Sequence, residues 1–471
     1  MSRVLVLDVV GLTPRILRSG DAPRLDTLPG GSGLRAALTP VLPAVTCSVQ
    51  ATFLTGLMPS GHGVVGNGWY FRDLAEVWLW RQSNRLVAGP RVWAPAEPTG
   101  AGASPAAATP CAKLFWWYNM HSTAAWSVTP RPVYPADGRK LPDIYTQPPE
   151  LRDRLVQELG MFPLFRFWGP TADLASSEWI AAASTIVLRE QRPELCLVYL
   201  PHLDYDLQRH GPDDPRSRQA VRDVDRVAGG LADEARGLGY EVVVLSEYGI
   251  TAVSGPVHIN RALRDAGLLR VHAPRGAEYL DPGASRAFAV ADHQVAHVYV
   301  AAPADVPGVA ALLRGLDGVA EVLDAQGKAA RGLDHPRSGE LVAVAAPDRW
   351  FTYYYWLDDR RAPDFARCVD IHRKPGYDPM ELMLDPDRRA MKLRAMSKLA
   401  MKTLGFRTIF DVIGLDAQHV RGSHGRLPDD PDDGPVLLTT TPAQGPAGGP
   451  DAPVHASGVA DLLRRLLAQR T

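Results

Sequence analysis

The sequence predicts an α/β fold: a doubly wound, mostly parallel sheet flanked by helices, with a smaller inserted α/β subdomain. Three near-continuous apolar runs, at residues 4–10, 195–200 and 240–245, are typical of parallel strands buried on both faces. Helical patterns over 176–191 and 217–238 alternate with these runs, as they do in doubly wound sheets. Polar residues follow each run. Because ligands gather at the carboxyl ends of such strands, we expect the functional site there.

Length and composition set the size and charge of the chain. Its 471 residues exceed one ordinary core, and 46% hydrophobic with 22% charged residues is typical of a globular protein. The 51 basic and 52 acidic residues give a net charge of -1. No global field therefore draws the protein to a nucleic acid polymer or an anionic membrane, and we expect a small-molecule partner. Nothing in the composition indicates the oligomeric state.

Cysteine usage and hydropathy indicate a compartment. The four cysteines are Cys47, Cys111, Cys196 and Cys368. They lack paired spacing, which suits a reducing cytoplasm better than a disulfide framework. The opening apolar run is interrupted by Asp8, so we interpret it as a buried strand. No apolar stretch reaches the roughly 18 residues of a membrane span, and a cytoplasmic location is predicted.

The chain divides into three predicted segments. Residues 1–252 form the first part of the core, residues 253–365 a smaller α/β subdomain, and residues 366–471 return to the core. Within the subdomain we expect strands at 286–290, 295–301 and 341–345 and a helix at 309–316. The final segment ends in an amphipathic helix from Ser457, the expected N-cap, to Gln469.

An aromatic run at residues 350–356 predicts packing in the core or subdomain. Aromatic side chains also occur at Trp69 and Tyr70 and at residues 115–118. They could stack a flat leaving group, although core packing is expected for most of them.

The stretch VLPAVTCSVQATFLTG, residues 41–56, places three nucleophile-type side chains before an apparent helix start. The Thr46 hydroxyl could cap that helix. It could also attack a phosphate, because free N–H groups and the helix dipole stabilise an anion there. A threonine hydroxyl needs a base or a metal to become reactive, so the second interpretation requires nearby carboxylates. Cys47 is expected to be a buried neighbour.

The chain resembles the nucleotide pyrophosphatase/phosphodiesterase branch of the alkaline phosphatase superfamily in three features that occur in the same order. They are Asp8 on the first strand, residues 41–56, and PSGHGVVGN at residues 59–67. The resemblance implies an alkaline phosphatase-like fold. It also implies that Asp8 and Thr46 bind one metal ion and that Thr46 attacks phosphorus. Asn67 matches the family asparagine that hydrogen-bonds a phosphate oxygen.

The next motif, LDYDLQRHGP at residues 203–212, is similar to the family pattern Asp-x-x-x-His followed by Gly-Pro. Asp204 matches the family aspartate, and Gln208 stands at the histidine position. A spacing of four places both on one face if the segment is helical. Asp206 and His210 keep the same spacing but lie two residues closer to Gly-Pro, so they are the alternative pair.

The last ligands implied by the resemblance are Glu247 and Tyr248 in SEYG, where the family has aspartate and histidine, and His424 in GSHGR. The implied cofactor is a pair of divalent or trivalent metal ions, one of them held by Glu247, Tyr248 and the threonine-side residues. Because oxygen ligands replace two histidines, Mn, Mg, Ca or ferric iron is favoured over Zn. The alternative is that Tyr248 only packs or hydrogen-bonds.

Two further segments carry polar side chains. In DIHRKPGYDP, residues 370–379, His372 or Asp378 could contact substrate or replace a lost ligand, and a solvated turn is the alternative. In ADHQVAHV, residues 291–298, strand alternation makes His297 a packed residue rather than a ligand.

We therefore expect a metal-dependent phosphohydrolase that cleaves a phosphodiester or pyrophosphate bond through a phosphothreonine intermediate, acting on a small phosphate ester or nucleotide-like substrate. A phosphomonoesterase or a phosphonate hydrolase is the nearest alternative. A non-catalytic binding module, with metals lost through Gln208 and Tyr248, is the alternative from another class. A sulfatase is disfavoured because Cys47 is not followed by x-Pro-x-Arg.

Overall fold

The computed structural model describes residues 2–95, 107–136, 139–406, 408–442 and 453–469. Within the predicted segment 366–471, residues 407, 443–452 and 470–471 therefore lie outside the described chain. Among the described helices, none has both the length and the apolar composition needed to cross a bilayer.

A nine-stranded sheet forms the centre of the molecule, in the order β21-β2-β20-β9-β1-β8-β5-β6-β7. In chain order its strands are β1 (Arg3–Val9), β2 (Arg35–Thr39), β5 (Cys111–Leu114), β6 (Trp126–Pro130), β7 (Ile144–Gln147), β8 (Leu195–Leu200), β9 (Tyr240–Leu245), β20 (Val436–Thr439) and β21 (Val454–His455). The five adjacent strands from β9 to β6 are parallel, and β7 and β20 join antiparallel. The predicted fold class is confirmed.

β1, β8 and β9 lie at the centre of the sheet because their apolar runs can be buried on both faces. β8 is buried from end to end, and so is β1 apart from its first residue. In β9 only Glu241 is partly exposed. The register pairs Asp8 with Tyr199 on one side and with Leu245 on the other. Parallel neighbours end at one edge of the sheet, so the residues following β8 and β9 lie beside Asp8.

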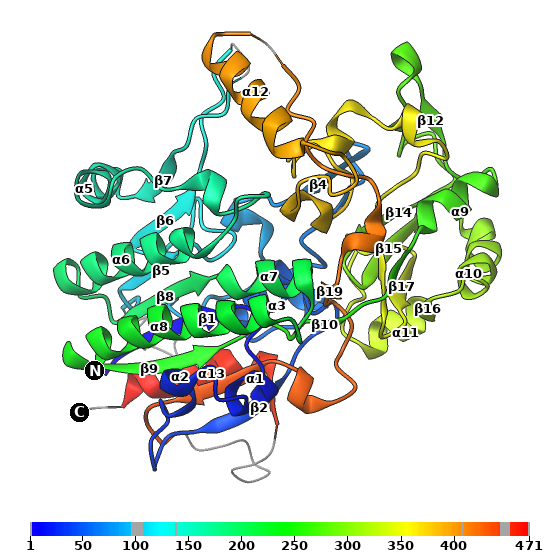
Figure 1. The fold of residues 1–471 in the computed structure, drawn as a ribbon. Helices are drawn as coiled ribbons and strands as arrows, with labels where there is room; N and C mark the ends of the chain where they lie inside the picture. Colours follow the sequence, from blue (N-terminus) through cyan, green and yellow to red (C-terminus); the bar gives the residue numbers. More distant parts are fainter. Residues whose placement is uncertain (1, 96–106, 137–138, 407, 443–452, 470–471) are drawn as a thin grey trace.

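Helices cover both faces of this sheet, as Figure 1 shows for α6 (Leu174–Glu190) and α8 (Pro215–Gly237) in front. Side chains of Asp173 and Asp214 cap the first turns of these two helices. On the other face, α3 (Thr46–Thr55) packs against α13 (Val459–Ala468). The sequence predicts both front helices within two residues at each end.

The prediction of Ser457 as the N-cap of the last helix is wrong. A 3-10 turn at residues 456–458 precedes α13, and Gly458 occupies the cap position without a side-chain hydrogen bond. The backbone N–H of Ser457 donates instead to the side chain of His455. A serine before an apolar helix can serve a tight turn rather than the helix itself, because both leave free N–H groups.

A second, four-stranded antiparallel sheet lies within residues 253–365, in the order β14-β15-β17-β16. Its strands are β14 (Ala287–Asp292), β15 (Val295–Val300), β16 (Val319–Leu323) and β17 (Leu341–Ala345). Helices α9 (Ile259–Asp265), α10 (Val306–Arg314) and α11 (Ala325–Ala330) accompany it. All of its strands are antiparallel, whereas the central strands of the main sheet are parallel.

The aromatic run at residues 350–356 packs in this second core, as predicted. Its Trp, Phe and Tyr side chains are fully buried among the apolar residues of β14, β15 and β17. The hydroxyls of Tyr353 and Tyr354 lack hydrogen-bond partners, so these side chains act chiefly as hydrophobic bulk.

The remaining elements connect the two sheets and cover their edges. The helices are α1 (Pro14–Arg18), α2 (Pro23–Asp26), α4 (Pro59–His62), α5 (Glu150–Leu159), α7 (His202–His210) and α12 (Met391–Thr403). The short strands are β3 (Gly68–Phe71), β4 (Glu76–Leu79), β10 (Thr251–Ala252), β11 (Gly255–Val257), β12 (Val271–His272), β13 (Tyr279–Leu280), β18 (Arg349–Phe351) and β19 (Gly422–Ser423). β10 pairs with β19, which brings residues after 422 to the end of β9.

Candidate functional site

Buried polar side chains gather at the carboxyl ends of β9, β1 and β8. These strand ends lie near the centre of Figure 1. β1 carries Asp8 near its end, α7 follows β8 and carries Asp204, and Glu247 with Tyr248 follows β9. The helix α3 and the residue after β19, His424, complete the group. These elements are far apart in sequence, and the parallel register brings them together.

Thr46 is the first residue of α3, and Val45 occupies the N-cap position without a side-chain hydrogen bond. The expectation that the Thr46 hydroxyl caps this helix is therefore wrong. Its Oγ1 lies 3.1 Å from the Tyr248 hydroxyl, and its side chain is buried. The threonine hydroxyl thus faces the strand ends rather than its own helix.

Gln50, one turn after Thr46, links two carboxylates. Its Nε2 donates to Asp8 Oδ2 at 3.1 Å and to Glu247 Oε1 at 2.6 Å, and its Oε1 accepts from the Trp117 N–H at 2.8 Å. The other carboxylate oxygens, Asp8 Oδ1 and Glu247 Oε2, are buried without a partner. We call Asp8, Thr46, Gln50 and Glu247 the Asp8 half of the site.

The Asp8 half places two buried carboxyl groups together without a cationic side chain beside them. Burial raises the pKa of Asp8 to about 7. Burial, followed by repulsion from Asp8, raises the pKa of Glu247 well above its usual range. Within the described residues, no lysine or arginine forms an ion pair with either carboxylate. Ionised carboxylates are costly in such a place unless a cation joins them.

The other half of the site is fully hydrogen-bonded around its aspartate. Gln208 Nε2 donates to Asp204 Oδ2 at 2.7 Å, and the Tyr248 hydroxyl donates to Asp204 Oδ1 at 3.3 Å. The Tyr377 hydroxyl donates to Gln208 Oε1 at 2.9 Å. Burial raises the pKa of Asp204 to about 7. We call Asp204, Gln208, Tyr377 and His424 the Asp204 half, and Tyr248 lies between the two halves.

His424 is held as a neutral ring. Its Nδ1 is 2.9 Å from the Ala44 carbonyl oxygen, so Nδ1–H donates there and Nε2 carries the lone pair. Nε2 is buried without a partner and lies 4.0 Å from Asp204 Oδ1. Burial lowers the pKa of His424 to about 3. The ring stacks on Tyr248 with a centroid distance of 3.5 Å.

The structure distinguishes the two pairs predicted on residues 203–212. The segment is helical, and Asp204 and Gln208 are buried and bonded to each other. The alternative pair turns elsewhere: Asp206 contacts Arg209 at 3.0 Å and His210 at 3.8 Å. The pair that matches the family spacing is therefore the one that faces the site.

Asn67 connects the start of α3 to the tip of the β14–β15 hairpin. Its Oδ1 accepts from the Cys47 N–H at 3.0 Å, and its Nδ2 donates to Asp292 Oδ1 at 3.0 Å. The Asn67 N–H donates to Asp292 Oδ2 at 2.7 Å. Burial raises the pKa of Asp292 to about 6. The sequence did not indicate that Asp292 orients Asn67, because the two residues are separated by 225 positions.

His293, at the same hairpin tip, has a left-handed backbone with φ of 59°. Its buried ring lies between His424 and Tyr377, at centroid distances of 3.6 and 3.7 Å. A strained backbone at a buried polar ring is a feature of functional sites. His297 packs inside β15 as predicted, bonded to the Val65 carbonyl at 2.8 Å.

Sequence reasoning missed Gln50 and Tyr377 as contributors to the site, and it noted His293 within residues 291–298 without assigning it a role. Gln50 had a usable signal, because a residue four positions after Thr46 lies on the same helix face. Tyr377 had none, because its contacts depend on tertiary packing.

The two additional candidates from residues 370–379 lie outside this hydrogen-bond network. Asp378 forms a buried ion pair with Lys374 at 2.7 Å and accepts from the Met380 N–H. His372 is exposed, and its pKa is lowered by burial of part of its ring beside Lys140 and Arg81. Neither side chain is hydrogen-bonded to Thr46, Asp8 or Glu247 within the described chain.

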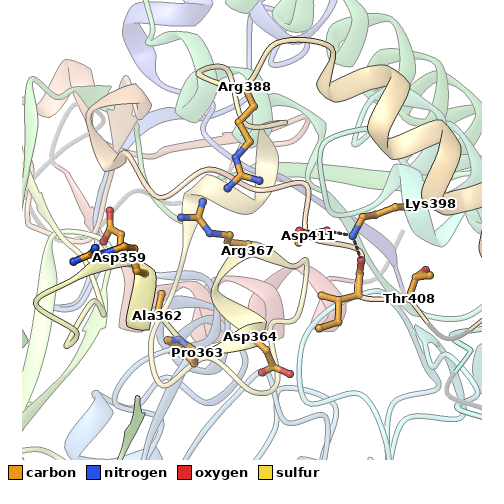
Figure 2. A pocket seen from close by; sticks show the side chains of 11 residues that line it. Asp359, Ala362, Pro363, Asp364, Arg367, Arg388, Lys398, Thr408 and Asp411 are labelled. Atoms are coloured by element: carbon orange, nitrogen blue, oxygen red, sulfur yellow. Dashed lines mark hydrogen bonds and ion pairs between the residues drawn. The ribbon is translucent and has the colours of Figure 1, made fainter. Parts of the chain in front are cut away.

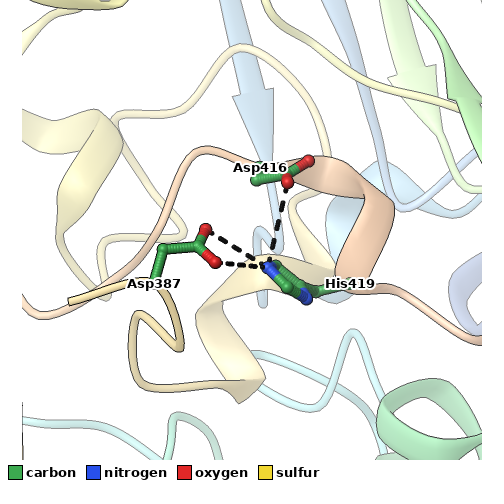
Figure 3. A group of neighbouring side chains, drawn as sticks. All are labelled: Asp387, Asp416 and His419. Atoms are coloured by element: carbon green, nitrogen blue, oxygen red, sulfur yellow. Dashed lines mark hydrogen bonds and ion pairs between the residues drawn. The ribbon is translucent and has the colours of Figure 1, made fainter. Parts of the chain in front are cut away.

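One compact group of metal-ligand atoms lies at the surface, among the residues that the structure describes. The ligand atoms of Asp387, Asp416 and His419 lie within 4.8 Å of one another. Figure 3 shows the two carboxylates turned toward the His419 ring. His419 Nε2 is 3.2 Å from Asp387 and 3.9 Å from Asp416, and both carboxylates are exposed. Exposed ion pairs of this kind are common. The Asp8 half offers two carboxylates and the Thr46 hydroxyl instead.

Comparison with known proteins gives a family and a fold. A model of the type I phosphodiesterase / nucleotide pyrophosphatase family matches residues 4–378. An uncharacterized pyrophosphatase/phosphodiesterase of Schizosaccharomyces pombe is 24% identical over 257 residues, which are 54% of this chain. The matched part spans 46% of the length of that relative.

Two solved structures share the fold over nearly the whole chain. Phosphonoacetate hydrolase from Sinorhizobium meliloti, in complex with phosphonoformate, superposes with a TM-score of 0.59 and 15% identity, covering 99% of this chain and 96% of the other. Murine ectonucleotide pyrophosphatase / phosphodiesterase 5, in an inactive form with AMP, gives 0.56 and 15%, covering 100% and 96%. Identities this low establish the fold alone.

Proposed function

Because this chain belongs to the type I phosphodiesterase / nucleotide pyrophosphatase family, whose members are hydrolases of phosphoester or anhydride bonds, we propose that it cleaves a phosphodiester or pyrophosphate bond with Thr46 as the nucleophile. One observation carries the proposal: a buried threonine hydroxyl at a helix start lies 3.1 Å from the Tyr248 hydroxyl, and one turn later Gln50 bonds Asp8 and Glu247, two carboxylates with unpartnered oxygens. Such a hydroxyl has the surroundings that an attacking alkoxide needs.

The Asp8 half fits a bound cation. Asp8 Oδ1 and Glu247 Oε2 are buried without donors, and no basic side chain offsets their charge in the described chain. Asp8, Glu247 and Thr46 would hold the ion, and their oxygen atoms favour Mn, Mg or Ca. When bound, the ion supplies a Lewis acid that lowers the pKa of the threonine hydroxyl.

The Asp204 half supports a second ion less well. Both Asp204 oxygens accept hydrogen bonds, and Gln208 uses its amide nitrogen and oxygen on Asp204 and Tyr377. Only the His424 Nε2 remains open among these atoms. We therefore propose one tightly held ion, in the Asp8 half. The second ion implied by the family resemblance remains a prediction. It would require Gln208 and Tyr248 to give up their hydrogen bonds to Asp204.

In this proposal Tyr248 relays the proton that Thr46 loses. The Thr46 hydroxyl is 3.1 Å from the Tyr248 oxygen, which in turn donates to Asp204 at 3.3 Å. As Thr46 Oγ1 bonds to phosphorus, its proton passes to Tyr248 while the phenol proton passes to Asp204, and the bond to the leaving oxygen breaks. A carboxylate with a pKa of about 7 is well matched to this task. Water then hydrolyses the phosphothreonine in the reverse sense.

Aromatic rings beside the site support a flat, nucleotide-like substrate. Trp80 and Trp117 lie 4.7 Å apart between centroids, and Trp80 lies 6.1 Å from Tyr377. The backbone N–H of Trp117 bonds Gln50 and the Tyr377 hydroxyl bonds Gln208, so both residues border the site. Both tryptophans are only half-buried, which leaves ring surface for a base to stack on.

The test is hydrolysis of bis(4-nitrophenyl) phosphate by the purified chain supplied with Mn, Mg, Ca or Zn. Thr46→Ala should lower kcat by about 1000-fold or more, because the nucleophile is removed. Thr46→Ser keeps a hydroxyl and should retain measurable turnover.

Thr55→Ala is the matched control, at the far end of the same helix, and should leave kcat within about threefold of the parent. If no metal supports turnover above that of Thr46→Ala, the proposal is wrong for diesters. Relative rates on a phosphomonoester and a phosphonate then distinguish the neighbouring hydrolase classes.

The competing proposal is a non-catalytic binding module. It is favoured by the hydrogen bonds from Gln208 and Tyr248 to both oxygens of Asp204, because these bonds occupy atoms that would otherwise bind a metal. Elemental analysis of protein purified without chelator separates the two. About one ion per chain supports the enzyme, and none supports the binding module.

A further inference from the structure

The segment 388–407 has a composition unlike the rest of the chain. It contains seven basic residues and no acidic residue, whereas the whole chain has a net charge of -1. The basic residues are Arg388, Arg389, Lys392, Arg394, Lys398, Lys402 and Arg407. Most of the segment is the helix α12, which Figure 1 shows at the edge of the molecule, away from the central sheet.

Large apolar side chains on α12 and the residues after it face solvent. Seven of the fourteen exposed large hydrophobic side chains of the described residues fall within residues 393–409. Leu393 is 67% exposed, Met396 66%, Leu404 75% and Phe406 63%. Leu393 and Met396 follow helical spacing, so they lie on one face. Exposed apolar residues clustered in this way mark an interaction site.

The opposite face of α12 is attached to the protein. Met391 is buried, Arg394 donates to Asp411 at 2.6 Å, and Lys398 contacts the same carboxylate. The inner contacts therefore fix which side of the helix faces outward. Arg389 and Lys392 are exposed and form no ion pair within the described chain.

A cavity of about 790 Å³ opens beneath the helix, and Figure 2 shows the side chains that line it. Its lining includes the basic residues Arg360, Arg367, Arg388 and Lys398 and the acidic residues Asp359, Asp364 and Asp411, so the cavity has mixed charge. The exposed cations Arg389 and Lys392 lie at the start of α12, beside the exposed apolar side chains. The apolar face and these exposed cations therefore occur on the same element.

We propose that α12 and the residues that follow it as far as Phe406, 391–406, form a docking surface for an anionic lipid bilayer. An amphipathic helix rich in Lys and Arg, with Leu, Met and Phe on its outer face, lies in the plane of the interface and buries that face to a depth of roughly 5–10 Å. Basic residues near the surface add attraction to anionic headgroups. The absence of any acidic residue over 388–407 selects an anionic surface over a neutral one.

This surface is distinct from the predicted partner of the chain as a whole. The overall charge gave no reason to expect a membrane, because the seven basic residues of this segment are balanced by acidic residues elsewhere. The proposal concerns peripheral attachment through one helix face, and it does not depend on the proposed hydrolytic function.

The experiment is co-sedimentation of the full chain with vesicles of phosphatidylcholine containing phosphatidylglycerol, and with vesicles of phosphatidylcholine alone. We expect binding to the anionic vesicles and at least about tenfold weaker partitioning to the neutral ones. The double variant Arg389→Glu and Lys392→Glu should weaken binding to anionic vesicles by at least about tenfold. The double variant Leu393→Ser and Met396→Ser should weaken it similarly, because the inserted face is lost.

The matched control is Leu74→Ser with Leu357→Ser, two side chains 53% and 51% exposed outside this segment, and it should bind like the parent. All substituted positions are exposed, so the thermal midpoint serves as a check on folding. Equal binding to both kinds of vesicle, or no binding to anionic vesicles at low salt, would overturn the proposal. A dimer that dissociates on Leu393→Ser and Met396→Ser would assign the face to a second copy of the chain instead.

Discussion

The two halves of the candidate site contain the same kinds of groups but differ in what their carboxylates contact. In the Asp8 half, two carboxylates share one amide donor and keep two oxygens without partners. In the Asp204 half, one carboxylate receives two donors, and the amide that serves it is itself bonded to Tyr377. The first arrangement leaves negative charge to be neutralised, and the second neutralises it with hydrogen bonds.

This difference indicates how a site can keep its chemistry when ligands change. A buried carboxylate with an unpartnered oxygen needs either a proton or a cation. A buried carboxylate with two donors is more weakly in need of a cation, although burial still raises the pKa of Asp204 to about 7. Gln208 and Tyr248, which stand where the family resemblance implies histidines, supply Asp204 with donors, and this arrangement suits the proton-accepting role proposed for Asp204.

The largest expected effect comes from neutralising one carboxylate in each half. Asp8→Asn should weaken Mn binding by at least about 100-fold, because it removes a charged ligand from the half whose carboxylates share one donor and keep two unpartnered oxygens. Asp204→Asn should change Mn affinity by less than about threefold, because that carboxylate is already satisfied. Isothermal titration calorimetry on both variants measures this without relying on turnover.

Asp292→Asn controls for the loss of a buried carboxylate as such, since Asp292 bonds Asn67 rather than either half. It should leave Mn affinity close to that of the parent. Equal loss of affinity in Asp8→Asn and Asp204→Asn would contradict the assignment of the ion to the Asp8 half.

A second effect is the pH dependence of the metal-free protein. Burial raises the pKa of Asp8 from 3.8 to about 7, so between these values the folded state holds a proton that the unfolded state has lost. Stability therefore falls as pH rises from about 4 to about 7, by up to about 4 kcal/mol for this group. In chelator-treated protein, Asp8→Asn should gain thermal stability relative to the parent across this range.

Buried histidines act in the opposite direction, and the comparison between parent and variant removes them. Burial lowers the pKa of His62 and of His424 to about 3, so their contribution to stability is lost as pH falls below about 6.5. Both histidines are present in parent and variant. With Mn added, the order should reverse, and a variant that stays the more stable would show that Asp8 does not bind the ion.

The sequence predicted the framework and the residues at the strand ends for a physical reason. Runs buried on both faces identify β1, β8 and β9, and parallel strands end at one edge, so Asp8, Asp204 and Glu247 had to lie close together. The C-terminal helix was located in the same way from its apolar period. Its cap was not, because Ser457 serves a turn that only the tertiary structure defines.

What contacts each carboxylate could not be predicted in the same way. Gln50 lies between Asp8 and Glu247 because α3 packs over the sheet edge, and Tyr377 reaches Gln208 from 169 positions away. Sequence spacing records which residues share a strand end or a helix face. It does not record which donors a distant loop brings, and these donors distinguish the two halves.

The smallest effect tests the outermost hydrogen bond of the Asp204 half. Tyr377→Phe removes the donor to Gln208 Oε1 and keeps the ring that stacks on His293 at 3.7 Å. We expect a loss of about 1 kcal/mol in the free energy of unfolding, measured by urea denaturation, because a buried acceptor loses its partner. Mn affinity should stay unchanged, since the Asp8 half is untouched. A gain of a second bound ion in this variant would mean that Tyr377 keeps Gln208 turned away from a metal, and the two halves would then differ by one hydroxyl group rather than by their ligands.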